Sequence, residues 1–137
     1  MIIDARDLIA GRLASYAAKR ALLGEEVGII NSELAVITGS KKVILRKYRA
    51  QDERGEPFHG PFQPKTPDRF LKRIIRGMIS YKKGKGLLAF KRIKCYNGVP
   101  DVFKDKKAET IGWVNINNTN GVKSITIGEL CQEIKRR

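Results

Sequence analysis

Three short apolar runs, each ended by a polar residue, divide the first forty positions of the chain. The runs are Ile2-Ile3, Val27 to Ile30 and Ala35 to Ile37. Continuous apolar runs of this length are typical of strands covered on both faces, as in a parallel sheet. Between the first two runs, a helix expected over residues 11–24 places Leu13, Ala17 and Ala21 on one smooth face that can lie close to a sheet. The pattern predicts a strand, helix, strand unit that opens an α/β domain.

Two further helices and a fourth strand are expected in the middle of the chain. Ser40 is a candidate N-cap for a helix over residues 41–50, and a second helix is expected over residues 67–79. The segment between them, residues 52–67, holds four of the five prolines. We therefore expect an extended arm across the surface, or one that becomes ordered only on binding. The remaining expected elements are a flexible basic loop at 81–86, a short helix at 87–92 and a strand at 93–96.

The pattern weakens after residue 100. Residues 111–116 are interpreted as loop or edge structure, and a turn-rich segment follows them. Ser124 or Thr126 is then placed to cap a final helix. The chain ends in three basic residues, which suit a helix C-terminus: Lys135, Arg136 and Arg137.

Length and composition favour a single domain, residues 1–137, with one hydrophobic core. Hydrophobic residues make up 42% of the chain and charged residues 31%. The two cysteines, Cys95 and Cys131, are widely separated, and neither a disulfide framework nor a tetrahedral metal site is indicated. No stretch approaches the roughly 20 apolar residues that cross a bilayer. We expect a soluble cytoplasmic protein with no membrane partner.

Nearly all of the positive charge lies in one central segment. Residues 41–94 contain seventeen Lys or Arg and four acids, a net +13 of the total +14, whereas both ends are nearly neutral. With Arg69 placed at 0° on a helical wheel, Lys72, Arg73 and Arg76 all fall within about 60° of it. Such neighbours repel by a few tenths of a kcal/mol per pair, so a compensating anion is expected. A solvated helix face is the plainer interpretation, but contact with nucleic-acid phosphates accounts better for the concentrated charge.

The residues argue against catalysis. Neither Gly-x-Gly-x-x-Gly nor Gly-x-x-x-x-Gly-Lys-Ser/Thr occurs in the chain. His59 is the single histidine, so it has no second imidazole for a metal site and no nucleophile to activate. The acids of the first forty residues are interpreted as strand-end and turn residues, and neither cysteine has an identifiable activating base. We expect no enzymatic activity, no cofactor, no metal and no small-molecule substrate.

Several short motifs are weak singly but specific in their order and spacing. They are Ile3-Asp4-Ala5, Gly11-Arg12-Leu13-Ala14-Ser15, Asn31-Ser32-Glu33, Ile37-Thr38-Gly39, Gly60-Pro61, Arg76-Gly77-Met78, Lys82-Lys83 with Gly86, and Tyr96-Asn97-Gly98-Val99-Pro100. With them the chain resembles the L13 family of large-subunit ribosomal proteins from residue 3 to about residue 100. A weaker similarity continues at the end. The inserted region between residues 50 and 67 and the overall length resemble archaeal or eukaryotic members, and compactness favours an archaeal one.

The resemblance implies a three-layer α/β/α domain around a four-stranded, mainly parallel sheet with basic loop and arm extensions. It also implies a structural protein that binds large-subunit rRNA and helps it assemble, with contact regions at Arg76, Gly77, Lys82 and Lys83. One departure is that Ile79-Ser80 stands where the family usually has Leu-Pro, and a proline common before the last loop glycine is absent. We therefore expect a less sharply ended helix and a loop that is more mobile before binding.

Charge and resemblance together give a set of candidate RNA-binding residues. Basic groups are expected on phosphates, and flat side chains on bases or sugars. The set is Lys42, Arg46, Arg49, Arg54, His59, Phe62, Lys65, Arg69, Lys72, Arg73, Arg76, Gly77, Tyr81, Lys82, Lys83, Lys85, Lys91 and Arg92. Expected partners are 23S-type rRNA and neighbouring large-subunit proteins. Two alternatives stay open, namely an RNA- or DNA-binding regulatory module that acts away from the ribosome, and a nucleotide-dependent enzyme, which the strand, helix, strand opening permits.

Overall fold

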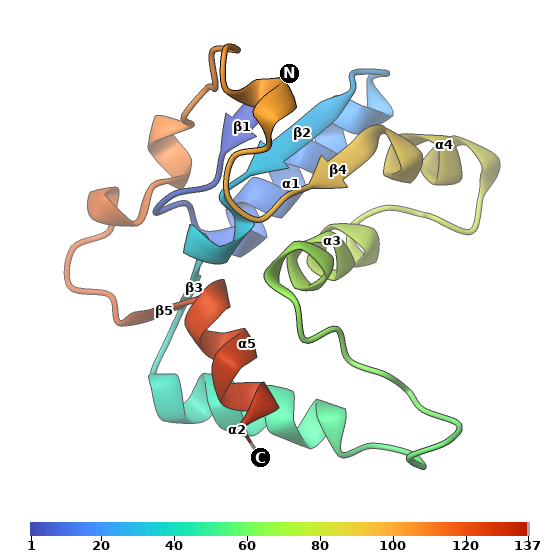
Figure 1. Ribbon diagram of the computed structural model, residues 1–137, viewed down its shortest axis with the longest axis vertical. Coiled ribbons are helices and arrows are strands. Elements are labelled where there is room, and N and C mark those ends of the chain that lie inside the picture. Colours follow the sequence, from blue (N-terminus) through green and yellow to red (C-terminus); the bar gives the residue numbers. More distant parts are fainter. Residues whose placement is uncertain (137) are drawn as a thin grey trace.

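A computed structural model describes residues 1–136 as a mixed α/β fold (Figure 1). Arg137, the last of the three basic residues expected to end the final helix, lies outside the described residues. The helices and strands are β1 (Ile2–Asp4), α1 (Ala10–Leu22), β2 (Val27–Ile30), β3 (Val36–Thr38), α2 (Lys41–Asp52), α3 (Pro67–Gly77), α4 (Gly84–Arg92), β4 (Ile93–Cys95), β5 (Ser124–Thr126) and α5 (Ile127–Lys135). Short 3-10 helices are η1 (Ser32–Leu34), η2 (Asp101–Phe103), η3 (Gly112–Val114) and η4 (Ile116–Asn118). Over these residues, no helix combines the length and the hydropathy that a bilayer span requires.

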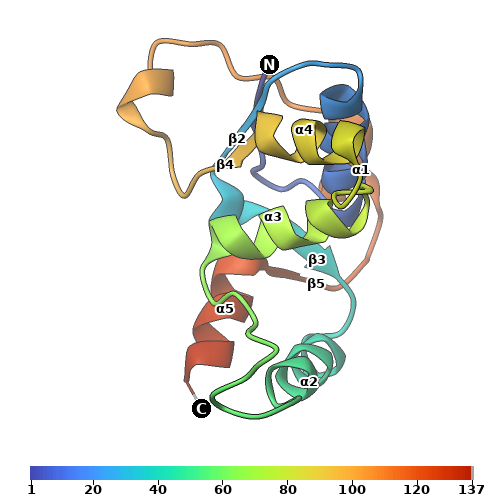
Figure 2. The same ribbon diagram turned by 90° about the vertical axis from the view of Figure 1, so that its right-hand side faces the viewer.

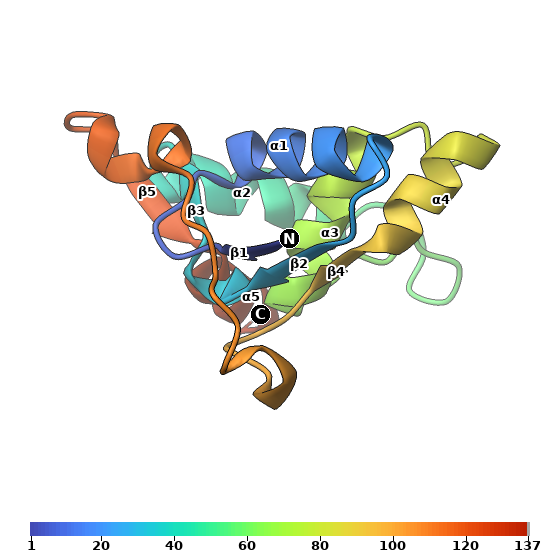
Figure 3. The same cartoon turned by 90° about the horizontal axis from the view of Figure 1, so that it is seen from above.

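The strand, helix, strand opening predicted from the first forty residues is confirmed. β1 pairs with β2 in parallel, and β2 pairs with β4 in parallel, so the order across the sheet is β1-β2-β4. α1 runs along one face of this sheet (Figure 3). Its small-residue face, Leu13, Ala17 and Ala21, is fully buried together with Ile29 in the centre of the sheet. Alanines let the helix approach the strands closely, and this contact forms the middle of the hydrophobic core.

The four-stranded sheet implied by the family resemblance is wrong for this chain. The third apolar run forms β3, which leaves the parallel sheet and pairs antiparallel with β5 in a separate two-stranded sheet. The physical reason is the connection, since only five residues separate β2 from β3, whereas a parallel crossover needs about a dozen or more. Asn31, in the left-handed region with φ 54°, turns the chain into η1 instead.

An irregular segment covers part of the sheet face opposite α1. Phe103 of η2 lies over Gly28 of β2, with ring carbon Cζ 3.5 Å from the position that a Cβ on Gly28 would take. The same ring packs edge-on against Tyr96, with centroids 5.3 Å apart. Figure 3 shows this segment projecting from the sheet on the side away from α1. The coarse prediction of an α/β fold is therefore confirmed, but this part of the face carries a coil and a single turn of 3-10 helix.

The predicted helix starts are largely confirmed, but α1 and α3 each end two residues before the expected position and α4 begins earlier than expected. Ser40 occupies the N-cap position of α2, although its side chain makes no capping hydrogen bond, and the Thr126 hydroxyl caps α5 by accepting from Glu129 N at 3.2 Å. α3 begins at Pro67 as expected. The basic loop predicted over residues 81–86 is shorter than expected, because its last three residues already form the first turn of α4. Residues 111–116, interpreted as loop or edge structure, lie in and around η3 and η4.

Candidate nucleic-acid interface

The basic segment forms one side of the molecule. In Figure 2, α4, α3 and α2 follow one another down the side that faces the viewer, and the arm connects α2 to α3 beside them. Apolar side chains anchor these helices to the core: Ala89 of α4, Leu71 and Ile75 of α3 and Ile44 of α2 are buried. The opposite faces of the same helices carry the cations.

The cationic row of α3 is present as predicted, but it is held by contacts within the chain. Arg69 is exposed and has no side-chain partner among the described residues, whereas the other three cations are half-buried. The Arg73 guanidinium donates to the Phe62 carbonyl at 2.8 Å. Lys72 Nζ lies 5.1 Å from the centre of the Phe90 ring, and the Arg76 guanidinium lies 5.0 Å from that of Tyr81. These contacts, worth up to about 1 kcal/mol each at exposed sites, fix where the charges point.

The cations of α2 divide between an internal and an external role. Lys42 and Arg46 are exposed, and their side chains have no ion-pair or hydrogen-bond partner within residues 1–136. Arg49, by contrast, turns to α5, where its guanidinium donates to the Glu133 carbonyl at 3.4 Å and lies 3.8 Å from the Glu133 carboxylate. Lys41 joins the same contact through Glu129 at 2.5 Å, and this hydrogen bond raises the pKa of Lys41. Arg49 therefore connects α2 to α5, although its side chain remains partly exposed.

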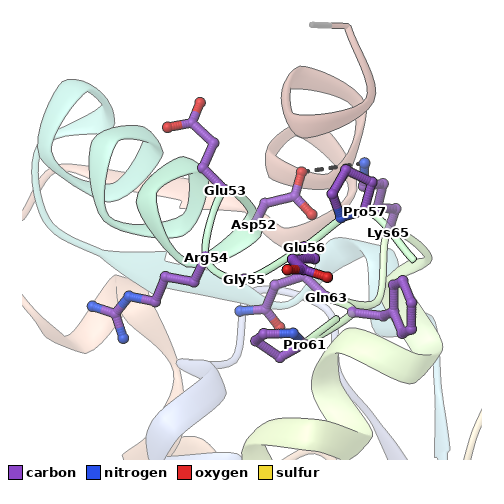
Figure 4. Close-up of a pocket in the computed structure, with 10 residues that line it drawn as sticks. Asp52, Glu53, Arg54, Gly55, Glu56, Pro57, Pro61, Gln63 and Lys65 are labelled. Atoms are coloured by element: carbon purple, nitrogen blue, oxygen red, sulfur yellow. Dashed lines mark ion pairs between the residues drawn. The ribbon is translucent and has the colours of Figure 1, made fainter. Parts of the chain in front are cut away.

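The arm, residues 53–66, has one defined path and carries less free positive charge than its sequence indicates. Lys65 pairs with Asp52 at 3.2 Å across the base of the arm (Figure 4). His59 lies 3.9 Å from the Glu56 carboxylate. A cavity of about 350 Å³ opens between residues 52–57 and residues 61–65, and its lining includes three carboxylates and two cations. The arm nevertheless presents flat side chains, since Phe62 is 68% exposed and Phe58 is 90% exposed.

The turn between α3 and α4 carries the densest group of free cations. Lys82, Lys83 and Lys85 are exposed and surround the N-terminus of α4, and their side chains have no acidic partner in the described part of the chain. Cations at the positive end of a helix dipole are unfavourably placed, so an anion bound there relieves both the dipole and the mutual repulsion of the lysines. Gly77, at the end of α3 beside this turn, is exposed with open space around its Cα.

The far end of α4 separates two adjacent predicted residues. Lys91 is exposed, whereas Arg92 is half-buried and its guanidinium donates to the Ala21 carbonyl at 3.3 Å, at the C-terminus of α1. Arg92 therefore ties α4 to α1. We call a predicted cation free when it is exposed and its side chain forms no ion pair, hydrogen bond or ring contact within residues 1–136. The free cations are Lys42, Arg46, Arg54, Arg69, Lys82, Lys83, Lys85 and Lys91.

One residue that the sequence-based set omitted lies among these groups. Lys47 of α2 is exposed and lines a groove of about 230 Å³ between α2 and α3, opposite Arg73 and Gly77. Its ammonium lies 5.6 Å from the centre of the Tyr48 ring. The helical pattern did not predict that Lys47 lines this groove, because Lys47 falls between the buried and the cationic sides of α2.

Two of the acids considered for catalysis, Asp4 and Glu33, have structural partners. Asp4, at the end of β1, accepts from the Asn31 side-chain amide at 2.9 Å, and both Glu33 carboxylate oxygens accept from Gly98 N. These contacts fill the carboxyl ends of the parallel strands, where open α/β sheets usually bind ligands. Burial raises the pKa of the Cys95 thiol to about 12 and that of Cys131 to about 11, so neither is an activated nucleophile.

Comparison with known proteins identifies the family. The model of the family described as ribosomal protein L13 matches residues 1–101. Large ribosomal subunit protein uL13 of Methanosarcina barkeri is 47% identical over 134 residues, which cover 97% of this chain and 96% of that protein. The proteins of the same name from Natronomonas pharaonis and Haloarcula marismortui are 41% and 40% identical, each over 134 residues covering 98% of this chain and 90% of the relative. All three relatives are archaeal, in agreement with the resemblance seen in the sequence. The chain therefore belongs to the ribosomal protein L13 family.

Proposed function

We propose that this chain is a structural constituent of the large ribosomal subunit in the cytoplasm. In this role it folds as one domain over residues 1–137, binds 23S-type rRNA and contacts neighbouring ribosomal proteins. Its archaeal relatives carry the name of a large-subunit protein, and the family consists of structural proteins, not enzymes.

The observation that carries this proposal is the uneven pairing of the cations. Some of the cations that hold the fold are paired with an acid, as at Lys65 with Asp52 and Arg49 with Glu133. The free cations have no such acid. Most of them lie on α2, α3 and around the start of α4, while Arg54 lies in the arm and Lys91 at the end of α4. A folded surface that leaves so much like charge uncompensated is suited to a polyanion, because phosphate contacts release condensed counterions.

The proposed mode of contact is recognition of RNA shape and backbone. In this mode, Arg69 and the lysines around the N-terminus of α4 contact phosphates. The exposed Phe62 ring stacks on an unpaired base, and Arg73 supports this residue by donating a hydrogen bond to its backbone carbonyl. The basic side chains neutralise phosphates where RNA helices approach each other. The half-buried cations of α3 contribute both charge and rigidity.

Sedimentation with ribosomes tests the proposal. A tagged copy is expected to migrate with large subunits through a high-salt gradient and to crosslink to rRNA through α3 and the α4 turn. A chain that stays at the top of the gradient, bound to other RNA or to DNA, would establish the regulatory module instead. Saturable binding of a mononucleotide that RNA fails to compete away would establish the enzyme.

A further inference from the structure

A second cationic surface lies outside the face just described. A hollow of about 570 Å³ opens on the sheet face away from α1, between β2, β4, the end of α4 and the η2 segment, and is hereafter the sheet-face hollow. Its base includes Gly28, Tyr96 and Phe103 contribute aromatic walls, and basic residues surround it. Figure 2 shows the η2 segment projecting to one side of β2 and β4.

The charge of the hollow is strongly positive and unpaired. Lys91, Lys94 and Lys106 line it and form no ion pair within residues 1–136, and Glu26 is the one carboxylate among the lining residues. Lys106 Nζ lies 5.6 Å from the centre of the Phe103 ring, so cation and flat ring face the same space. Aromatic rings beside free lysines are the combination that holds a base and its flanking phosphates.

The hollow is continuous with the α3 face. Lys94 and Tyr96 also line a neighbouring cavity of about 290 Å³ whose other side is formed by Arg69 and Lys72 of α3. A nucleic-acid strand that follows the α3 cations therefore meets Lys94 next and then enters the hollow. This continuity favours a nucleotide that is part of a longer strand over a free small molecule.

We propose that the sheet-face hollow receives one unpaired nucleotide of the RNA that α3 binds. The base packs against Phe103 and Tyr96, and the flanking phosphates lie on Lys91, Lys94 and Lys106. The volume lies within the roughly 300 to 1,000 Å³ of pockets that enclose small ligands, and a base inside a duplex is stacked and cannot enter. The inference rests on the proposed function, but it assigns a binding site and a ligand class to residues outside the α2 and α3 faces.

The experiment compares single-stranded with double-stranded RNA on the full chain. Fluorescence anisotropy is measured with labelled hexauridylate and with a 12-base-pair RNA duplex, for the wild type and for K94E/K106E. The charge-matched control is K19E/K123E, since both of those lysines are exposed and lie outside the hollow. We expect K94E/K106E to bind hexauridylate at least tenfold more weakly than the control, with the slope of log affinity against log salt lowered by about 1.4 for two lost single-strand phosphate contacts.

A second variant separates stacking from charge. Phe103→Leu retains an apolar side chain over Gly28 but removes the flat ring, and we expect about a fivefold or greater loss of hexauridylate binding with duplex binding unchanged. Circular dichroism of each variant confirms the fold, and the amide signals of Gly28 and Tyr96 in NMR spectra are expected to shift with hexauridylate.

Two results would overturn the inference. One is equal hexauridylate affinity of K94E/K106E and the control, with no shift at Gly28. The other is a K94E/K106E chain that binds naked rRNA normally but fails to join particles once other ribosomal proteins are present, since that would assign the hollow to an acidic protein segment. Neither result touches the proposed function, which fails only if the wild-type chain does not sediment with large subunits.

Discussion

Replacing Gly86 with alanine tests whether close backbone contact with Ser80 holds the lysine-rich turn between α3 and α4 in place. Gly86 is buried in the first turn of α4, and a Cβ there would overlap the carbonyl group of Ser80 and lie 3.2 Å from the Ser80 Cα. Because the blocking atoms belong to the backbone, no side-chain rotation relieves the overlap. Either the first turn of α4 or the end of the preceding turn must move.

The structure provides a matched control and sets the size of the effect. Gly84 lies two residues earlier in the same turn, and a Cβ there meets nothing within 4 Å. Gly84→Ala is therefore expected to be neutral or to stabilise the protein by up to about 1 kcal/mol. Gly86→Ala gains the same propensity but suffers overpacking of about 1–3 kcal/mol. The two variants should differ by about 1–3 kcal/mol, and each kcal/mol shifts Tm by roughly 3–5 °C in a chain of this size.

Urea unfolding followed by circular dichroism measures the difference in stability, and filter binding to large-subunit rRNA measures its consequence. We expect Gly86→Ala to unfold at lower urea concentration and to bind rRNA more weakly than Gly84→Ala under conditions where both are folded, because the displaced turn carries Lys82, Lys83 and Lys85. Equal midpoints for the two variants would show that α4 does not rest on Ser80. Unequal midpoints with equal rRNA binding would show that the position of the turn does not matter for RNA.

Four further predictions concern the basic side and the buried thiol of Cys95. K82E/K83E is expected to weaken rRNA binding and to lower the slope of log affinity against log salt by between about 1 and 2. The control K19E/K123E should leave that slope unchanged. Arg73→Ala removes the hydrogen bond to the arm, so trypsin should cut residues 53–66 faster than in Arg69→Ala, which loses no contact within the chain; equal cutting rates would contradict the role of Arg73. Burial raises the pKa of Cys95 to about 12, so iodoacetamide at pH 8.5 should alkylate the native protein about tenfold or more slowly than the urea-unfolded chain. Because the unfolded thiol ionises first, native stability should also fall as the pH rises above about 9, as unfolding followed at pH 8, 9 and 10 would show.

The sequence predicts the elements that local periodicity determines. α1 and α3 form where apolar residues recur on one helical face, and the residues placed on the packing side of α3, such as Leu71 and Ile75, are buried. β3 illustrates the limit. Its apolar run was correctly read as a strand, but its partner β5 lies almost ninety residues later in a short segment that reads as a helix cap. Pairing between distant strands depends on tertiary packing, which no local pattern encodes.

The start of α4 could not be predicted from propensity either. Two glycines within three residues normally indicate a loop, because glycine is a poor helix former. Here the close approach of Ser80 makes Gly86 obligatory at a buried contact, and packing outweighs the intrinsic cost of about 1 kcal/mol. The basic loop is therefore shorter than the pattern of glycines predicts.

The distribution of charge along the sequence predicted the basic side of the molecule. It did not predict which of the cations there pair with acids of the chain itself. Lys65 and Arg49 were assigned to RNA by their sign and segment, yet their partners Asp52 and Glu133 come from neighbouring or distant elements. Partners of this kind are visible only once the helices are packed. The Arg49–Glu133 pair is partly exposed and contributes no more than about 1 kcal/mol, so an RNA phosphate competes with it at modest cost. The Asp52 side chain is almost buried, so Lys65 leaves its partner at a greater cost.

The contacts that each cation makes within the chain decide how readily it can bind an RNA phosphate. The free cations of α3 and the α4 turn meet a phosphate without breaking any contact, so they are expected to determine the initial approach of RNA. Lys65 must first leave Asp52, which itself would then face the incoming phosphate as a like charge. With three carboxylates around its cavity, the arm gains little from phosphates and more from its exposed Phe58 and Phe62 rings. RNA contact should therefore be centred on α3 and α4 and be strongly salt-dependent there, while the arm should add a weaker, salt-insensitive contact through stacking.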